Sequence, residues 1–233
     1  MKIKTKILTT FLKKVKMSAG QEIIECILNF SKEGLKMSAN SAAQQSRASG
    51  LLKASAFTDY EEIASIGIGD LPTVVDVISR FGEDITLKVE GNLLTVSGLG
   101  KKVEIELMDV QFITSDITEP KLEFADTFVF EAEKIKEIIS DAKLSKDSVL
   151  AITTEPKKVI FSNSGKYKFT HAFDMATCKG GSIAKFGDPF VDAVANLTEK
   201  LEFSVKSDYP IKILEKTEHT IITIIVAPRV ETE

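Results

Sequence analysis

The feature that most constrains the fold of this chain is an internal repeat. The segments that begin at Val75 and at Val191 carry apolar residues at matching positions, with a constant offset of 116 residues. A second register, offset by 124 residues, aligns Phe11 with Ile135 and Leu35 with Val159. The two registers follow one another in the same order in both halves of the chain. Because self-similarity at a fixed spacing marks repeated structural units, the sequence predicts two similar domains.

Each predicted domain contains two helical patches. In the first patch, Leu8, Phe11 and Val15 form one apolar stripe with helical spacing. Asp70 and Asp188 stand just ahead of a proline, a pattern typical of helix starts. The four predicted helices cover residues 7–18, 71–82, 131–142 and 188–198.

Short runs of alternating apolar and polar residues predict antiparallel strands around these helices. The runs cover residues 25–30, 34–38, 85–89, 93–97, 103–108, 149–153, 158–162, 201–205 and 220–226. The predicted fold class is therefore α+β, with two helices on antiparallel sheets in each of two similar domains, 1–108 and 127–233. Residues 109–126 are acidic, contain Pro120 and lack helical periodicity, so we interpret them as an exposed connecting loop.

The composition excludes several classes of protein. Apolar residues make up 43% of the 233 residues and charged residues 27%, which is typical of globular chains. Cys26 and Cys178 are the two cysteines, and their neighbours form no metal motif, so we expect a reducing compartment, no metal and no cofactor. No apolar run is long enough for a membrane span, and lysines interrupt the first apolar run too early for a signal peptide.

Positive charge is concentrated near the start of the chain. Residues 1–16 contain six lysines and no acidic residue, although the whole chain has a formal net charge of −4. Solvated helix faces often carry lysines, but an array of cations without base-reading groups also suits contact with a phosphate backbone. The cations on the predicted helices that we assign to DNA binding are Lys13, Lys14, Lys16, Arg80, Lys134, Lys136 and Lys143.

Motifs from both ends of the chain resemble one protein family. The ending Asp208-Tyr-Pro-Ile-Lys-Ile213 and Ile225-Val-Ala-Pro-Arg-Val-Glu231 is similar to that of the proliferating cell nuclear antigen (PCNA) family. Phe11-Leu-Lys-Lys-Val15, Glu33-Gly-Leu-Lys-Met37 and Glu106-Leu-Met-Asp109 match further pieces in the family's order. The resemblance is to family members of archaeal or viral type. It implies a DNA sliding clamp, which is a trimeric ring whose helices line a hole around duplex DNA.

The resemblance also implies partners and where they bind. Family members bind peptide motifs of polymerases, ligases and nucleases in a pocket under the connecting loop, and a clamp loader places them on DNA. Carried over by position, the pocket here comprises Asn40, Gln44, Gln45, Arg47, Ile117, Pro210, Ile225, Val226, Ala227 and Pro228. Several of these are less apolar than their family counterparts, which suggests altered partner choice. Ring closure implies pairing of edge strands near residues 101–107 and 166–173.

The residues give no sign of an enzyme. His171 and His219 are the two histidines and fall in strand-like runs, and Gly67-Ile-Gly69 lacks the third glycine of a dinucleotide-binding motif. Three alternatives stay open: a homotrimeric clamp, one subunit of a heterotrimeric clamp, and a DNA-binding scaffold that does not encircle DNA. For each we expect no membrane association and a cytoplasmic location, or a nuclear one in a eukaryote.

Overall fold

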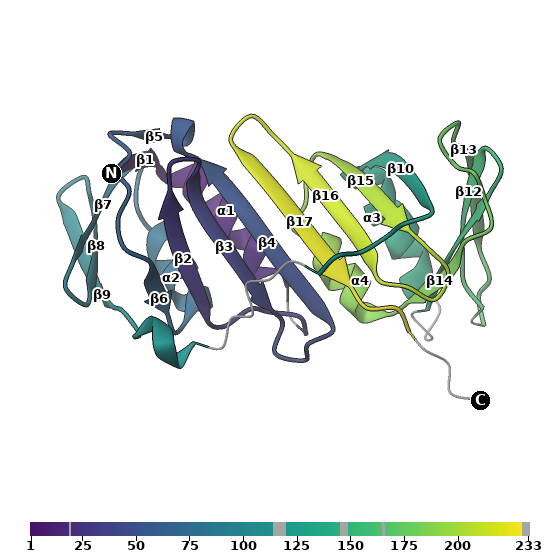
Figure 1. Ribbon diagram of the computed structural model, residues 1–233, viewed down its shortest axis with the longest axis horizontal. Coiled ribbons are helices and arrows are strands. Elements are labelled where there is room, and N and C mark those ends of the chain that lie inside the picture. The colour runs from purple at the N-terminus through teal and green to yellow at the C-terminus, as the bar shows by residue number, and fades with distance from the viewer. Residues whose placement is uncertain (19, 114–119, 145–148, 165, 230–233) are drawn as a thin grey trace. The chain divides into compact units, whose positions relative to one another are not determined.

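The computed structural model describes residues 1–18, 20–113, 120–144, 149–164 and 166–229. The chain forms two compact units, each with two helices on antiparallel strands, as the fold-class prediction requires (Figure 1). Unit 1 comprises Met1–Met17, Glu22–Thr118 and Thr217–Ile222. Unit 2 comprises Ser18–Gln21, Glu119–Lys216 and Thr223–Glu233. The sequence-based bounds, 1–108 and 127–233, do not include this exchange of short segments.

Unit 1 has two groups of strands and two helices. One sheet has the strand order β5 (Phe57–Thr58), β1 (Lys2–Lys4), β7 (Asp84–Glu90), β8 (Leu93–Gly98) and β9 (Lys101–Glu106). The other strands follow the order β4 (Ser46–Lys53), β3 (Gly34–Asn40), β2 (Cys26–Ser31) and β6 (Ile66–Ile68). The helices are α1 (Thr5–Lys16) and α2 (Leu71–Ser79), and the short 3₁₀ turns are η1 (Ala54–Ala56) and η2 (Val110–Phe112).

The packing of α1 on β4 depends on a glycine. The predicted stripe residues Phe11 and Val15 are completely buried. A Cβ atom at Gly50 would lie 2.6 Å from Val15 Cγ1 and 2.7 Å from Phe11 Cε2, closer than real Cβ contacts. A side chain at position 50 would therefore push the helix away from the strand, and glycine permits the close approach.

The predicted cap of α2 is confirmed, whereas that of α4 (Asp188–Val194) is not. The Thr73 backbone N–H donates to the Asp70 carboxylate at 3.0 Å, and proline occupies the first turn. In α4 the N-cap residue is Gly187, and Asp188 is already helical. Asp188 therefore places a negative charge in the first turn, which the helix dipole favours, instead of capping it.

Unit 2 repeats the plan around phenylalanines. Its first sheet has the order β13 (Thr170–Asp174), β12 (Lys158–Ser162), β11 (Leu150–Glu155) and β14 (Ile183–Phe186). Its other strands follow the order β10 (Asp126–Glu131), β15 (Lys200–Val205), β16 (Ile211–Lys216) and β17 (Thr220–Val226). The rings of Phe128 and Phe203 stack at 5.5 Å, and those of Phe128 and Phe161 meet edge to face at 6.2 Å. The helix α3 (Ala132–Lys143) buries Ile135, Ile138 and Ile139, as its spacing predicts.

Asp126 is a buried structural residue and not part of an exposed connecting loop, which corrects the sequence interpretation. It begins β10 and is 2% exposed. Its carboxylate accepts hydrogen bonds from the hydroxyls of Thr154 (2.6 Å) and Ser182 (3.2 Å), and from the backbone N–H groups of Lys179 (2.6 Å) and Gly180 (3.2 Å). Burial alone would raise the pKa of Asp126, but these hydrogen bonds outweigh it and hold the pKa below its usual range.

Strand β4 was not predicted, and its composition explains why. The inward positions of β4 are Ser46, Ala48, Gly50 and Leu52, so three of the four side chains are small or absent. Because most of the inward side chains are small, the sequence does not show the alternation of large apolar and polar residues that predicts a strand. As a result Asn40 and Arg47, which lie outside the predicted strands, belong to β3 and β4 and stand opposite one another.

The helices of the described residues include none that is both long and apolar enough to span a membrane.

Removal of the Asp126 charge should destabilise the protein. Because the carboxylate accepts four hydrogen bonds, we expect Asp126→Asn to lower the free energy of unfolding at pH 7 by about 2 kcal/mol. A lowered pKa stabilises the folded state above the ordinary carboxyl value, and this contribution disappears as the pH falls through the folded-state pKa. The wild type should therefore lose more stability than the variant between about pH 5 and pH 2.

Urea unfolding at several pH values measures both effects. Glu131→Gln is the matched control, because Glu131 lies in the same strand but is exposed, with Lys200 at 3.5 Å. We expect it to change stability by less than about 0.5 kcal/mol. Equal stability losses in the two variants would contradict a structural role for the Asp126 charge.

Candidate nucleic-acid interface

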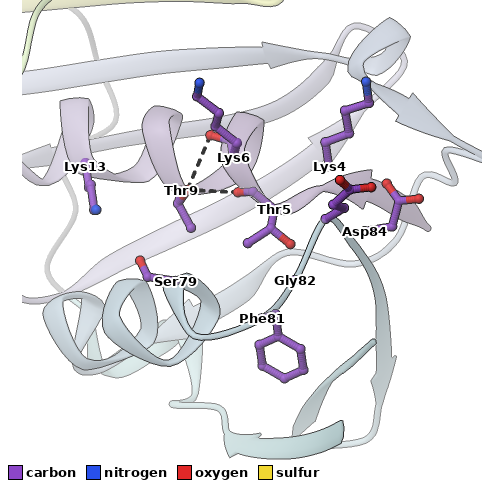
Figure 2. Close-up of a pocket in the computed structure, with 10 residues that line it drawn as sticks. Lys4, Thr5, Lys6, Thr9, Lys13, Ser79, Phe81, Gly82 and Asp84 are labelled. Atoms are coloured by element: carbon purple, nitrogen blue, oxygen red, sulfur yellow. Dashed lines mark hydrogen bonds between the residues drawn. The ribbon is translucent and has the colours of Figure 1, made fainter. Parts of the chain in front are cut away.

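A groove of about 630 Å³ lies between the start of α1 and the end of α2, within unit 1 (Figure 2). The backbone holds its two walls together. The Thr5 N–H donates to the Glu83 carbonyl oxygen at 2.8 Å. Lys4 of β1 stands opposite Asp84 of β7 in the antiparallel pairing of these two strands. The Thr9 hydroxyl donates to the Thr5 carbonyl oxygen at 2.8 Å, which turns its side chain along the helix. The first turn of α1 is thereby fixed against the segment that follows α2.

Three exposed lysines, Lys4, Lys6 and Lys13, line the groove together with Glu83 and Asp84. In Figure 2 the Lys13 side chain extends toward α2, whereas Lys4 and Lys6 extend to the other side of α1. Lys2 Nζ lies 3.4 Å from the Asp84 carboxylate, so that acid is already partly neutralised. The surface around the start of α1 is therefore positive, and its cations are on long side chains that suit contact with phosphates and not with particular bases.

Thr5 contributes a polar atom to the wall of this groove. The residue is 6% exposed, and its hydroxyl has no hydrogen-bond partner among the described residues. An unpaired buried hydroxyl costs free energy unless water or a ligand atom meets it. The groove thus combines three lysines, two carboxylates and one hydroxyl without a protein partner.

The lysines predicted on α1 have three different environments. Lys13 is exposed, as expected. Lys14 is 3% exposed, so the prediction that it lies on the solvent-facing side of α1 was wrong. The buried arc of α1 extends on both sides of the stripe, from Thr5 and Thr9 to Lys14, and is wider than the apolar residues alone indicate. Lys16 is half-buried and forms an ion pair with Glu22, so its charge is largely neutralised inside the chain.

Among the other cations that we assigned to DNA binding, Lys134 and Lys136 form ion pairs. Arg80 is exposed and forms the C-cap of α2. On α3, Lys134 Nζ lies 2.8 Å from Glu137, and Lys136 Nζ lies 3.9 Å from Glu133.

Lys143 is exposed in the last turn of α3. Burial, and next the neighbouring Asp188, raise the pKa of Asp192, while Lys143 acts to lower it. Lys143 therefore lies close enough to influence an acidic residue of α4. The cations of α3 thus stand among acidic residues.

The residues of the predicted partner pocket belong to both units. In unit 1, Asn40, Gln44 and Gln45 are exposed, and Arg47 is half-buried with a hydrogen bond of 3.0 Å to Ser38. In unit 2, Ala227 is exposed, whereas Pro210, Ile225 and Pro228 are half-buried. Ile117 lies outside the described residues.

Val226 is a core residue and not an accessible part of the pocket, which corrects the prediction. It is the last residue of β17 and is completely buried. The side chains of a strand alternate between faces, so Ile225 and Ala227 point away from the interior when Val226 points into it. A partner can contact only the exposed side of this segment.

The thiols and histidines make no reactive group. Burial raises the pKa of Cys26 to about 12, and burial followed by the charge of Asp126 raises that of Cys178, so both remain protonated thiols. His171 Nε2 lies 2.8 Å from the Asp141 carboxylate, and its ring packs against Phe169 and Phe173. Within the described ranges, no cluster of three or more His, Cys, Asp or Glu residues is arranged to hold a metal ion.

The comparisons with known proteins agree with this geometry. No family model matches the sequence. The DNA polymerase sliding clamp of Methanococcus maripaludis is 26% identical over 245 residues, covering 96% of this chain and 97% of the relative. DNA polymerase sliding clamp 2 of Pyrobaculum aerophilum is 23% identical over 236 residues, covering 89% and 90%. The chain is thus similar, over almost its whole length, to archaeal proteins named DNA polymerase sliding clamp.

Solved structures show that the fold is the clamp fold. PCNA of A. fulgidus, in a structure with the C-terminal region of FEN-1 bound, matches with a TM-score of 0.88 and 18% identity. That match covers 100% of this chain and 98% of the A. fulgidus PCNA chain. PCNA of Entamoeba histolytica matches with a TM-score of 0.82 and 15% identity, covering 98% of both chains.

The residues that the sequence-based assignment missed are Lys4, Lys6 and Thr5. A signal for the two lysines was present, because residues 1–16 contain no acid. They were not assigned because the predicted helix begins at residue 7, whereas α1 begins at Thr5 and Lys4 is the last residue of β1. Nothing in the sequence marks Thr5, whose role in the groove wall follows from the position of Glu83.

Reversal of the groove charges should weaken DNA binding. We expect Lys6→Glu combined with Lys13→Glu to remove about two phosphate contacts, which lowers the slope of log affinity against log salt by about 2. Fluorescence anisotropy of a labelled duplex at salt concentrations between about 25 and 200 mM measures this slope. The control is Lys32→Glu, an exposed lysine between β2 and β3. An unchanged slope in the double variant would remove this groove from the DNA interface.

Polar substitution at Val226 should affect folding first. Because the side chain is completely buried, we expect Val226→Thr to lower the free energy of unfolding by about 1–2 kcal/mol. The neighbouring Ala227→Ser, at an exposed position, should change it by less than about 0.5 kcal/mol. Urea unfolding distinguishes the two, and equal effects would mean that Val226 is not part of the core.

Proposed function

We propose that this chain is a DNA sliding clamp that encircles duplex DNA and tethers replication and repair enzymes to it. The observation that carries the proposal is full-length similarity to proteins named DNA polymerase sliding clamp, on a chain with the clamp fold. The lysines that line the groove at α1 support it, because long cationic side chains suit contact with phosphates. In this role the chain is a non-catalytic scaffold that uses no cofactor or metal.

A ring explains why weak DNA contacts suffice. Topology prevents dissociation, so the helices need only hold the duplex loosely, and contacts to phosphates permit sliding because the backbone repeats every base pair. Lys13 and Arg80 are exposed for such contacts, whereas the ion-paired Lys16, Lys134 and Lys136 interact with DNA only after partial loss of their Glu partners. An array of cations that bound the phosphates strongly would slow the movement of the ring along DNA.

The assembly we propose is a homotrimer. Strands β9 and β13, which correspond to the expected ring-closing segments, lie at the ends of their sheets. Pairing of one edge with the other between copies makes a head-to-tail contact, which closes into a ring when the rotation fits. Placement of a closed ring on circular DNA requires it to open, so a clamp loader is among the proposed partners.

The proposed protein partners are DNA polymerase and other clamp-binding enzymes. One solved relative carries the C-terminal region of FEN-1, which supports recognition of short peptide segments. The exposed parts of the segments around Gln44 and Pro228 are the surfaces we assign to this contact. Polar side chains such as Asn40 and Gln45 favour peptides with more hydrogen-bonding groups than a purely apolar anchor. The location that follows is wherever the DNA is replicated, the cytoplasm of a prokaryote or the nucleus of a eukaryote.

Light scattering tests the assembly. We expect a mass of three times 25.6 kDa at micromolar concentration. A stable monomer would instead favour one subunit of a heterotrimer or a scaffold that does not encircle DNA.

A polymerase assay tests the function. On primed circular DNA, the chain with its loader should lengthen the products made by its replicative polymerase, since a ring cannot slide off a circle. On short linear DNA with open ends the effect should be lost. Equal stimulation on both templates would contradict encirclement.

A further inference from the structure

Three segments of unit 2 meet along the outer edge of β14. The Asp208 N–H donates to the Ile183 carbonyl oxygen at 3.1 Å, and the Arg229 N–H donates to the Lys185 carbonyl oxygen at 2.7 Å. The Ser207 hydroxyl accepts a hydrogen bond from the Ile183 N–H at 3.0 Å. The turn that joins β15 to β16 and the segment that follows β17 therefore both lie beside β14 (Figure 1).

Side chains, and not backbone groups, are what this edge offers to a partner. The hydrogen bonds from Ser207, Asp208 and Arg229 already use the outward backbone groups, so a partner strand has no free edge to extend. Ile183 and Lys185 alternate with buried residues of β14 and point away from the core. Ile183 is 53% exposed, although it is a large apolar residue.

The charge of this edge is mainly positive. The charged residues of segments 183–185, 206–209 and 227–229 are Lys185, Lys206, Asp208 and Arg229, which gives three cations and one carboxylate. Lys206 and Arg229 are exposed, and neither forms an ion pair within the ranges that the structure describes. The whole chain has a formal net charge of −4, so the edge differs in sign from the molecule that carries it.

An aromatic pair lies next to these cations. The rings of Tyr209 and Phe124 meet edge to face at 6.0 Å, and Lys206 Nζ lies 5.2 Å from the centre of the Tyr209 ring. Both rings are half-buried, so each leaves part of its area open. Tyrosine and arginine are enriched in protein interfaces, where they combine apolar area with hydrogen bonding. The edge thus combines apolar area with positive charge.

We propose that the β14 edge surface, which comprises Ile183, Lys185, Lys206, Tyr209 and Arg229, binds an acidic stretch of a clamp-binding protein. This inference rests on the proposed function, in which a partner peptide is held at the neighbouring Pro228, and it adds the chemistry of the sequence that flanks that peptide. Carboxylates of the partner face Lys206 and Arg229. An apolar side chain of the partner covers Ile183 and Tyr209.

The apolar groups favour a protein partner over a nucleic acid. A phosphate backbone is held by cations and hydrogen-bond donors, and it gains nothing from the exposed side chain of Ile183. An acidic peptide gains from both kinds of group. Because the chain as a whole is negative, the local cations decide where such a peptide settles.

A set of peptides that differ only in charge tests the proposal. The probe is a labelled peptide of the C-terminal region of FEN-1, the segment bound in the A. fulgidus structure, with a pair of aspartates, asparagines or lysines added at either end. At the end that reaches the β14 edge surface, we expect aspartates to lower the dissociation constant about fivefold relative to asparagines at about 50 mM salt. Lysines should raise it by a similar factor. Fluorescence anisotropy measures the constants, and the differences should shrink at about 1 M salt.

A double variant links the charge effect to this surface. Lys206→Gln combined with Arg229→Gln removes the two exposed cations and should abolish the difference between the acidic and the neutral probe. The matched control is Lys200→Gln combined with Lys216→Gln, which removes the same charge from exposed positions. These lysines stand at the opposite ends of β15 and β16, about 17 Å away along each strand. The control should keep the difference.

The possible failures are distinguishable. A wild type that binds none of the probes would overturn the proposed peptide recognition and this inference together. Equal affinity for the acidic and neutral probes would overturn this inference alone, as would a difference that persists in the Lys206 and Arg229 variant or vanishes in the control. A labelled DNA duplex is the last probe. If the Lys206 and Arg229 variant weakens duplex binding as strongly as Lys6→Glu with Lys13→Glu, the surface contacts DNA and the proposal is wrong.

Discussion

The close packing of α1 on β4 determines which charges the helix presents. Phe11 and Val15 rest over Gly50 without an intervening side chain, and this contact fixes the rotation of the helix about its own axis. Once the rotation is fixed, the helical period assigns every lysine its place. Lys6 and Lys13 face outward, while Lys14, next to Val15, falls inside the buried arc. A methyl group at position 50 would shift the helix and with it the arrangement of cations along the groove.

Sequence patterns predicted the fold where side chains are large and failed where they are small. The stripes of α1 and α3, the Asp70 cap and the strands 158–162 and 220–226 are confirmed, because bulky apolar residues recur at fixed spacing. Strand β4 escaped prediction because its inward side chains are small, and Asp126 was taken for a loop residue because a buried carboxylate looks like an exposed one in sequence. Its hydrogen-bond donors are distant along the chain, so no local pattern reveals them.

The candidate interface was predicted in part for a related reason. Positive charge near the start of the chain is visible in the sequence, but its neutralisation is not. Lys16 meets Glu22 across the end of a helix, whereas Lys134 meets Glu137 within one, and only the second spacing is readable in advance. The two units therefore differ in effective charge although each has helices rich in lysine. Ion pairs within the helix therefore offset part of the positive charge of α3, which the number of lysines alone does not show.

The anchoring of Asp126 also has a mechanical consequence. The described end of the connecting segment enters β10 at this residue, where one carboxylate is bonded to Thr154, to Ser182 and to the backbone of residues 179–180. Tension applied to that segment is therefore distributed over three separate parts of unit 2 at its first strand residue.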